Sequence, residues 1–375
     1  MKKLFLIALA VFGLCLASNA QSRQITDFDS GWKFALGDQK SAQTAGFNDR
    51  SWRSLDLPHD WSIEGENLQD NPGGGSIGYF PMGIGWYRKT FNVPGFDRNK
   101  KYSIEFDGVY MNSTVWINGH ELGTWPYGYS SFSYDLTPYL KANGNVIAVK
   151  VDNSLQPNSR WYSGSGIYRH VRLVETSKTY FDKWGVFNYT QEIQGGKAVI
   201  RIESSITNEL NSRMNGTVKH VLVDAEGNEV AETWVRVEIL AGVTHPVVQT
   251  LTVENPKLWS LDAPYLYTLR STISENNTEY DRVENVVGVR TIEYDVDKGF
   301  FLNGQHIKMY GVNVHGDAGA VGVAVPGRVW ERRLEIFKSG GCNAIRTAHN
   351  TPDPTFLEAC DKVGMLVMEE AFDRS

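Results

Sequence analysis

The stretch that decides the fold is residues 343–368, NAIRTAHNTPDPTFLEACDKVGMLVM. It predicts a buried strand over 343–346, a helix over 354–363 and an apolar strand over 365–368. The preceding residues predict a strand over 306–314 and a helix over 328–339. Strands that alternate with helices through short links indicate parallel βα units. These units are predicted to be the opening of a (β/α)8 TIM barrel, which needs about 250 residues when complete.

The residues before this segment show the shorter alternation of antiparallel β structure. From about Ile25 to Glu175, short alternating segments are broken by Gly, Pro, Asn and Asp, and Asn118-Gly119 is a strong hairpin signal. Residues 179–291 hold about seven short strands, the size of an immunoglobulin-like sandwich. We therefore predict a mainly β chain. A jelly-roll sandwich spans 21–177, an immunoglobulin-like sandwich spans 178–292, and an incomplete barrel spans 293–375.

The amino terminus has the pattern of a secretory signal peptide. Met1-Lys2-Lys3 is followed by an apolar run over 4–17 and by the small-residue site Ser18-Asn19-Ala20. The apolar run is too short to favour a transmembrane helix, and no other stretch could span a bilayer. We predict a signal peptide over 1–20 and an exported protein, either periplasmic or secreted.

The net charge limits the classes of partner that the chain can bind, and the cysteine content limits the kinds of disulfide and metal site it can form. The formal net charge of −6 becomes −8 once Lys2 and Lys3 are removed, which argues against nucleic acid or an anionic membrane. Cys342 and Cys360 are the cysteines left after cleavage, and we expect free buried thiols. No CxxC or His-rich cluster predicts a zinc site, so we predict no cofactor. The 12% aromatic content suits a sugar-binding protein, but it also suits a plain sandwich.

In βα barrels the reacting groups follow the carboxyl ends of the strands. Polar residues at these ends are Asn313, His315, Asp317, Arg346, His349, Glu369, Glu370 and Asp373. Each alone could serve only as a loop hydrogen-bonding residue. His315, Arg346 and His349 follow successive strands, and together they predict a polar pocket for a hydroxyl-rich ligand. Glu369 and Glu370 point to opposite faces of a strand, so at most one of them faces this pocket.

Several motifs, in this order, carry a resemblance to a known family. They are Leu57-Pro58-His59-Asp60-Trp61, Gly85-Trp86-Tyr87-Arg88-Lys89, Trp116-Ile117-Asn118-Gly119, Trp161-Tyr162-Ser163-Gly164-Ser165-Gly166-Ile167-Tyr168-Arg169, Leu258-Trp259-Ser260, Gly311-Val312-Asn313 with His315, and Asn343-Ala344-Ile345-Arg346 with His349. The chain resembles the N-terminal part of glycoside hydrolase family 2, which includes β-galactosidases, β-glucuronidases and β-mannosidases. The resemblance covers essentially the whole mature chain.

The resemblance implies retaining hydrolysis of β-glycosides by two glutamates about 5 Å apart. Both are expected beyond Ser375, so we assign no catalytic residue here and expect the 375-residue chain to be inactive by itself. The family implies that Arg346 supports the nucleophile and that His315 and His349 contact sugar hydroxyls. It also implies that Arg160 and Trp161 contact the substrate. Glu370 matches a position where some members hold a divalent cation, but we predict no metal site in this chain.

Within the family, the sequences over 57–61 and 311–326 resemble those of β-galactosidases most. Gly316 and the sequence His349-Asn350-Thr351-Pro352 depart from the usual family pattern, in loops that set sugar selectivity. The predicted function is hydrolysis of terminal β-galactosides, and the predicted partner is a β-galactoside-containing oligosaccharide. A non-catalytic carbohydrate-binding protein and a β-glucuronidase or β-mannosidase relative remain alternatives. Homo-oligomerisation of the full-length protein remains open.

Overall fold

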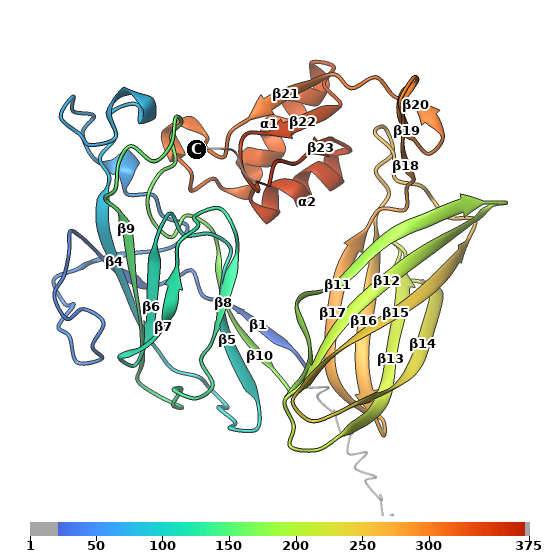
Figure 1. Cartoon of the computed structure of the whole chain (residues 1–375), viewed down its shortest axis with the longest axis horizontal. Helices are drawn as coiled ribbons and strands as arrows, with labels where there is room; N and C mark the ends of the chain where they lie inside the picture. The colour runs from blue at the N-terminus through green and yellow to red at the C-terminus, as the bar shows by residue number, and fades with distance from the viewer. Residues whose placement is uncertain (1–21, 372–375) are drawn as a thin grey trace, which may run out of the picture.

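The computed structural model describes residues 22–371, which form two β-sandwiches and a small α/β segment that bridges them (Figure 1). The predicted signal peptide and Asp373 lie outside the described residues. Within the described part of the chain, no helix is long and apolar enough to cross a membrane. The chain is mainly β and ends in a partial TIM barrel, as predicted.

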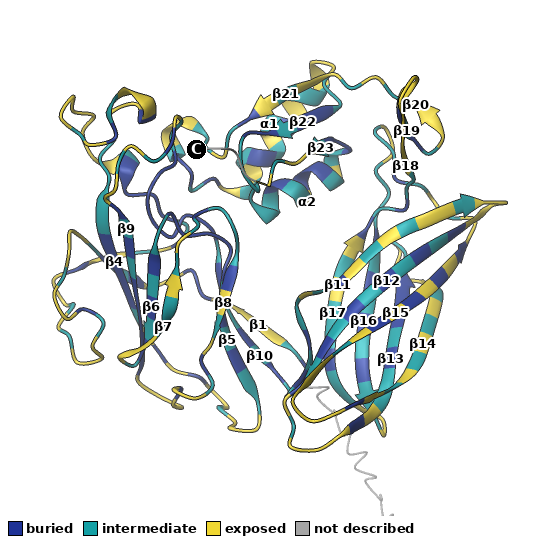
Figure 2. Cartoon of the chain, in the orientation of Figure 1, coloured by how far each residue is buried: buried dark blue, intermediate teal, exposed yellow. Residues whose placement is uncertain are grey.

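The first domain is a sandwich of two antiparallel sheets. The strands of its six-stranded sheet, in spatial order, are β3 (Arg53–Leu55), β2 (Trp32–Leu36), β4 (Gly83–Phe91), β9 (Asn145–Asn153), β6 (Ser113–Ile117) and β7 (His120–Trp125). The four-stranded sheet is made of β1 (Gln24–Asp27), β10 (Val171–Thr176), β5 (Lys101–Phe106) and β8 (Phe132–Asp135). Two short 3-10 helices, Ser62–Glu64 and Gly74–Ile77, lie in its loops. Apolar residues from both sheets meet in one buried core, because alternate residues of each strand point inward (Figure 2).

The predicted hairpin is confirmed. Asn118 and Gly119 form the two-residue loop between β6 and β7, and both have positive φ, 51° and 88°. A loop of this kind needs positive φ at both central residues, which Asn and Gly tolerate best.

The second domain has the seven strands that the sequence predicts. One sheet contains β11 (Thr179–Gln194), β12 (Lys197–Asn208) and β15 (Val243–Glu254). The other contains β14 (Glu229–Ile239), β13 (Met214–Val223), β16 (Tyr267–Glu275) and β17 (Thr278–Val287). Strand β12 alternates strictly between buried and less buried residues, the pattern of a strand with one face on the core. No disulfide ties the described sheets together, so apolar packing between them supplies the core.

A small antiparallel sheet of β18 (Ile292–Asp295), β19 (Gly299–Leu302) and β20 (Gln305–His306) leads into the barrel segment. The predicted strand over 306–314 is wrong in its first half. His306 pairs with Phe301 in this small sheet, and the barrel strand begins only at Gly311. Ile307 and Met309 instead pack on the apolar cluster around the buried Trp259, and the backbone N–H of Ile307 donates to the carbonyl oxygen of Phe300 in β19.

The barrel segment consists of β21 (Gly311–Val314), α1 (Gly327–Ser339), β22 (Ala344–Thr347), α2 (Pro354–Val363) and β23 (Leu366–Met368). A one-turn 3-10 helix, Gly319–Val321, lies between β21 and α1. The three strands are parallel, in the order β21-β22-β23. Helices α1 and α2 pack on each other through Trp330 and Phe356. Strand, helix and strand alternate as the quoted stretch predicts, so the carboxyl ends of the strands share one edge.

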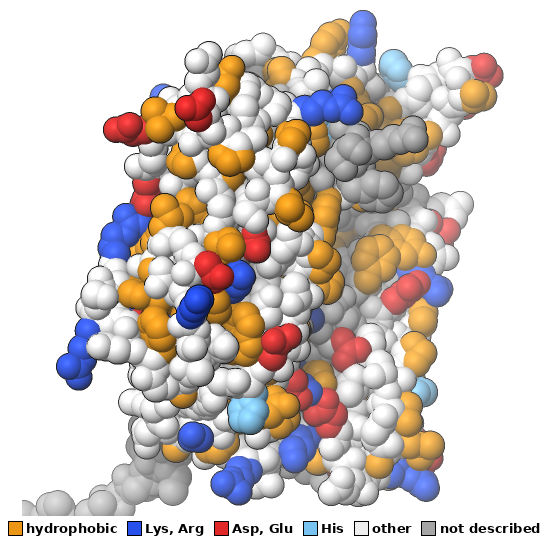
Figure 3. Space-filling view, turned by 60° about the vertical axis from the view of Figure 1, so that its left-hand side comes forward, with side chains coloured by type: hydrophobic (Ala, Val, Ile, Leu, Met, Phe, Trp, Pro, Cys, Tyr) orange, Lys and Arg blue, Asp and Glu red, His pale blue; other side chains and the backbone are white. Residues whose placement is uncertain are grey.

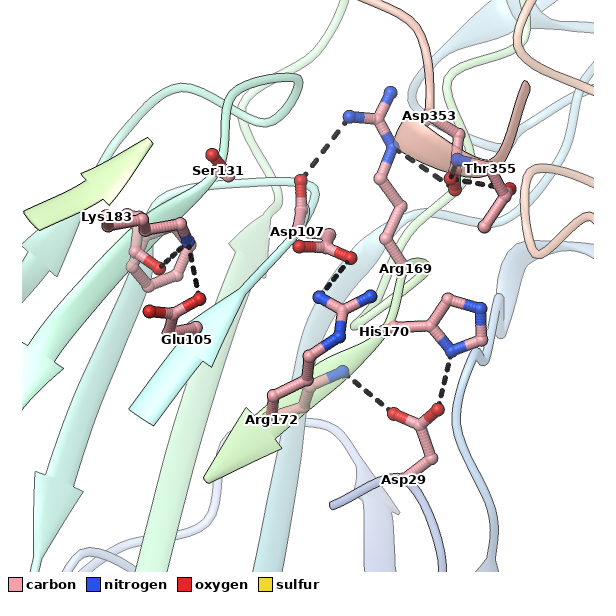
Figure 4. A network of polar contacts seen from close by, with 12 residues as sticks. Asp29, Glu105, Asp107, Ser131, Arg169, His170, Arg172, Lys183, Asp353 and Thr355 are labelled. Atoms are coloured by element: carbon pink, nitrogen blue, oxygen red, sulfur yellow. Dashed lines mark hydrogen bonds and ion pairs between the residues drawn. The ribbon is translucent and has the colours of Figure 1, made fainter. Parts of the chain in front are cut away.

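Polar contacts fix the barrel segment on the first domain (Figure 4). The buried Arg169 donates to the carbonyl oxygen of Thr351 at 2.9 Å and lies 3.8 Å from the carboxylate of Asp353, the N-cap residue of α2. In the same view Arg172 forms an ion pair with Asp107 at 2.6 Å. Trp259 of the second domain donates to the carbonyl oxygen of Asp361 in α2 at 2.8 Å. The barrel segment is therefore held by both sandwiches, and the loop after β22 is held by the first one.

Candidate functional site

Three aromatic rings meet at the carboxyl ends of β21 and β22. His315 directly follows β21, and His349 follows β22 after one intervening residue. Their ring centroids are 5.4 Å apart. Trp161, on a loop of the first domain, lies 6.1 Å from His315 and 5.0 Å from His349, centroid to centroid. Two domains thus build one small aromatic surface at the edge where barrel strands end.

Arg346 and Glu370 form the charged part of the site. Strand pairing places Arg346 of β22 opposite Asn313 of β21, and its guanidinium donates to the Asn313 side chain at 3.2 Å. The same guanidinium forms an ion pair with Glu370, whose other oxygen lies 3.1 Å from Nδ1 of His349. Glu369 is exposed, so only one of the two adjacent glutamates turns toward the site, as predicted.

The charges of this cluster are compensated within it. The Glu370 carboxylate balances the Arg346 guanidinium and orients the ring of His349. Burial lowers the pKa of His315, and the nearby His349 and Arg346 lower it further against the opposing effect of Asp317. A neutral imidazole has one donor and one acceptor nitrogen. His315 can therefore both donate to and accept from a hydroxyl group near pH 7.

Tyrosines of the first domain form hydrogen bonds with residues of the candidate site. Trp161 donates through Nε1 to the hydroxyl of Tyr129 at 3.0 Å, and the Tyr127 hydroxyl donates to Asn350 at 2.7 Å. Trp161, Tyr129 and Asn350 line an interdomain cavity of about 40 Å³, together with Tyr162 and Trp330. Sequence reasoning missed these tyrosines. Their signal was the aromatic-rich stretch Trp125-Pro126-Tyr127-Gly128-Tyr129, which has no periodicity that would point to the barrel.

The predicted site residues differ in how the structure places them. His315, Arg346, His349 and Trp161 come together through direct contacts or the shared partner Glu370. Arg160 is exposed on the Trp161 loop, and within residues 22–371 no contact with the other four is described. The roles of all five residues in binding a ligand stay predictions.

Among the residues that the structure describes, the cluster around Glu370 does not fit a divalent cation. Across residues 22–371 no group of three or more His, Cys, Asp or Glu side chains has the arrangement of a metal site. Glu370 already binds the Arg346 guanidinium. A cation at that carboxylate would lie against a fixed positive charge, which disfavours it.

Three family models match successive parts of the chain. The sugar-binding domain of glycosyl hydrolases family 2 matches residues 79–177, the model named for the family itself matches 185–290, and its TIM barrel domain matches 295–374. The chain belongs to glycosyl hydrolase family 2. The matches follow the order of the first sandwich, the second sandwich and the barrel segment.

Relatives within glycosyl hydrolase family 2 carry more than one activity in their names. Beta-galactosidase BoGH2A of Bacteroides ovatus is 51% identical over 96% of this chain and 43% of its own length. A putative beta-glucuronidase of Formosa agariphila is 41% identical over 93% of this chain and 33% of its own length. The crystal structure of a family 2 member from Bacteroides cellulosilyticus superposes with a TM-score of 0.90 at 36% identity, over 93% of this chain and 46% of that one. The chain thus spans less than half the length of these relatives.

Proposed function

We propose that this chain is the sugar-recognition part of an exported retaining β-glycosidase that acts on terminal β-galactosides. The observation that carries the proposal is the convergence of Trp161, His315 and His349 with the Arg346–Glu370 pair at the strand ends. In a TIM barrel this edge is where substrates bind. Membership of glycosyl hydrolase family 2 supports a glycoside as the ligand.

The chemistry of the cluster suits a neutral sugar. An indole face offers apolar surface to the C–H face of a sugar ring, and the two imidazoles offer hydrogen bonds to its hydroxyls. A uronic acid would require an uncompensated cation for its carboxylate. The charge of Arg346 is already balanced by Glu370, which favours a galactoside over a glucuronide. The name of the 51% identical relative supports the same choice.

The described residues account for binding better than for bond cleavage. Retaining glycosidases use two carboxyl groups about 5–5.5 Å apart, one as nucleophile and one as acid/base. At this site Glu370 is held by Arg346 and His349, and its neighbour Glu369 faces away. Hydrolysis therefore requires carboxylates other than these two, and the chain by itself is expected to bind sugar without cleaving it.

The test is a titration of the chain with methyl β-galactoside, methyl β-glucuronide and methyl β-mannoside. Binding is measured by isothermal titration calorimetry or by ligand-observed NMR. We expect the galactoside to bind best, and Trp161→Ala to weaken its binding by about tenfold, because the stacking surface is lost. Trp184→Ala is the matched control, since Trp184 is an exposed tryptophan of the second domain. Tighter glucuronide binding would overturn the galactoside assignment, and no sugar binding at all would overturn the recognition role.

A second assay separates binding from catalysis. The purified chain, free of host glycosidase, is incubated with an aryl β-galactoside, and release of the aryl alcohol is followed. We expect no turnover above buffer. Turnover that Glu370→Gln abolishes would show that these residues carry the reaction themselves, contrary to the proposal. Binding without turnover is also what the alternative of a non-catalytic carbohydrate-binding protein predicts.

Export is tested independently of sugar binding. The chain is expressed with residues 1–20 in a bacterium, and the mature amino terminus is determined by mass spectrometry of the periplasmic and secreted fractions. We expect a mature chain that begins at Gln21. An uncut chain found only in the cytoplasm would contradict export.

A further inference from the structure

Asp60 of the first domain is almost fully buried, with 2% of its surface exposed, and its carboxylate accepts four hydrogen bonds. None of the four donors carries a charge. Carboxylates buried without a cation are costly unless hydrogen bonds replace the lost water. At Asp60 the four hydrogen bonds take the place of that water, so the carboxylate depends on the groups that donate them.

The two oxygens of Asp60 serve different parts of the molecule. Oδ1 accepts from the backbone N–H groups of Ser62 and Ser165, both in the first domain, at 3.0 Å each. Oδ2 accepts from the Tyr162 hydroxyl at 2.6 Å and from the backbone N–H of Val323 at 3.1 Å. Val323 lies between β21 and α1 of the barrel segment, so one carboxylate oxygen joins two domains.

The surrounding chain is shaped to admit this contact. A Cβ on Gly322 would lie 2.2 Å from Oδ2 of Asp60, and a Cβ on Gly164 would lie 2.3 Å from a methyl group of Val323. Both glycines have positive φ, 58° and 64°, which disfavours any other residue further. The buried side chain of Val323 packs against first-domain tyrosines. The barrel loop and the carboxylate therefore fit each other closely.

The loop that Asp60 holds is part of the candidate site. It starts just after His315 and contains Asp317, while Tyr162 directly follows Trp161 in the sequence. We propose that Asp60 is a positioning residue. It holds the barrel loop 316–325 against the first domain and so sets the distance between Trp161 and His315. Among the described residues, Asp60 makes no direct contact with the rings of Trp161, His315 and His349. Its effect reaches these rings through Tyr162 and Val323.

Asp60→Asn is the most selective test. The remaining amide oxygen can still accept from Ser62 and Ser165, whereas the amide nitrogen cannot accept from Tyr162 or Val323. Amide hydrogen exchange of the chain, measured by mass spectrometry, should rise about tenfold in the peptide that covers 318–325, with strands β4 and β9 unchanged. Asp152→Asn, at the carboxyl end of β9, is the matched control, because that carboxylate accepts hydrogen bonds from Ser154, two residues further along the chain.

Gly322→Ala tests the same contact from the barrel side, since its new methyl group would displace Asp60. If the two changes break one contact, the double variant should exchange no faster than the faster single variant. Exchange in 318–325 that stays at the wild-type rate in Asp60→Asn would overturn the proposal, and so would equal acceleration throughout the first domain, which indicates a folding defect. This readout does not need sugar binding, so it stands even if the proposed function fails. Weaker binding of methyl β-galactoside by both variants would extend the role to the sugar.

Discussion

The indole ring of Trp161 lies 5.0 Å from the imidazole ring of His349, centroid to centroid, although the two residues belong to different domains. Trp161 is fixed by its hydrogen bond to Tyr129, and His349 by its contact with Glu370. The site therefore exists only when the first domain and the barrel segment are docked. The charged side chains on the face shown in Figure 3 are of both signs and interspersed.

Replacing Glu370 by Gln should shift sugar preference. The change keeps the size of the side chain but leaves the Arg346 guanidinium without its counter-charge. Affinity for methyl β-glucuronide should rise by about fivefold or more at low salt and fall again as salt screens the new attraction. Calorimetric titration with the galactoside and the glucuronide measures the shift. An equal change for both sugars would show that charge compensation at Arg346 does not govern selectivity.

Arg346→Lys should weaken galactoside binding by about five- to tenfold, because a lysine ammonium cannot hold Asn313 and Glu370 at once in the fork geometry of arginine. The thermal unfolding midpoint should change little, since the Arg346 side chain is 37% exposed. Arg328→Lys, on the exposed face of α1, serves as the matched control. A large fall in the midpoint would assign Arg346 to folding instead of binding.

Acid should destabilise the second domain through His220. This histidine is fully buried, and burial lowers its pKa from 6.5 to about 4. In the unfolded chain it takes up a proton as pH falls below about 6.5, whereas the folded chain resists protonation until about pH 4. The free energy of unfolding should therefore fall by about 3 kcal/mol between these values, in addition to other titrating groups.

Urea unfolding at several pH values measures this dependence. His220→Gln should flatten the curve between pH 6.5 and 4, because glutamine does not titrate. His306→Gln, at an exposed position, is the control for replacing a histidine by glutamine as such. An unchanged slope in His220→Gln would mean that other groups set the acid sensitivity.

The barrel segment should open before the sandwiches do. Among the described strands, β21 and β23 each pair only with β22, so each has one unpaired edge. Limited proteolysis should cut first after about Gly299. Trp259→Phe should speed this cleavage about fivefold, because it removes one hydrogen bond to Asp361, worth about 1 kcal/mol. Trp116→Phe, in the first domain, is the control, and a segment as resistant as the sandwiches would contradict the prediction.

The types of element were predictable because their signals are local. Alternation in β12, the Asn118-Gly119 hairpin and the helix over 354–363 all follow from backbone preferences and from which face of each element is apolar. The strand expected over 306–314 was wrong in its first half because an apolar run does not reveal its partner. In the structure Ile307 is covered by the Trp259 cluster, a contact that depends on how the second domain docks.

The sequence by itself determined two sandwiches, a parallel βα segment, and the placing of His315, Arg346 and His349 at strand ends. Only the tertiary structure decided that Trp161 joins these histidines, that Glu370 neutralises Arg346, and that Asp60 holds the barrel loop. The reason is physical. Periodicity reports which face of an element is buried, whereas the partner of a side chain depends on the docking of segments that lie far apart in the chain.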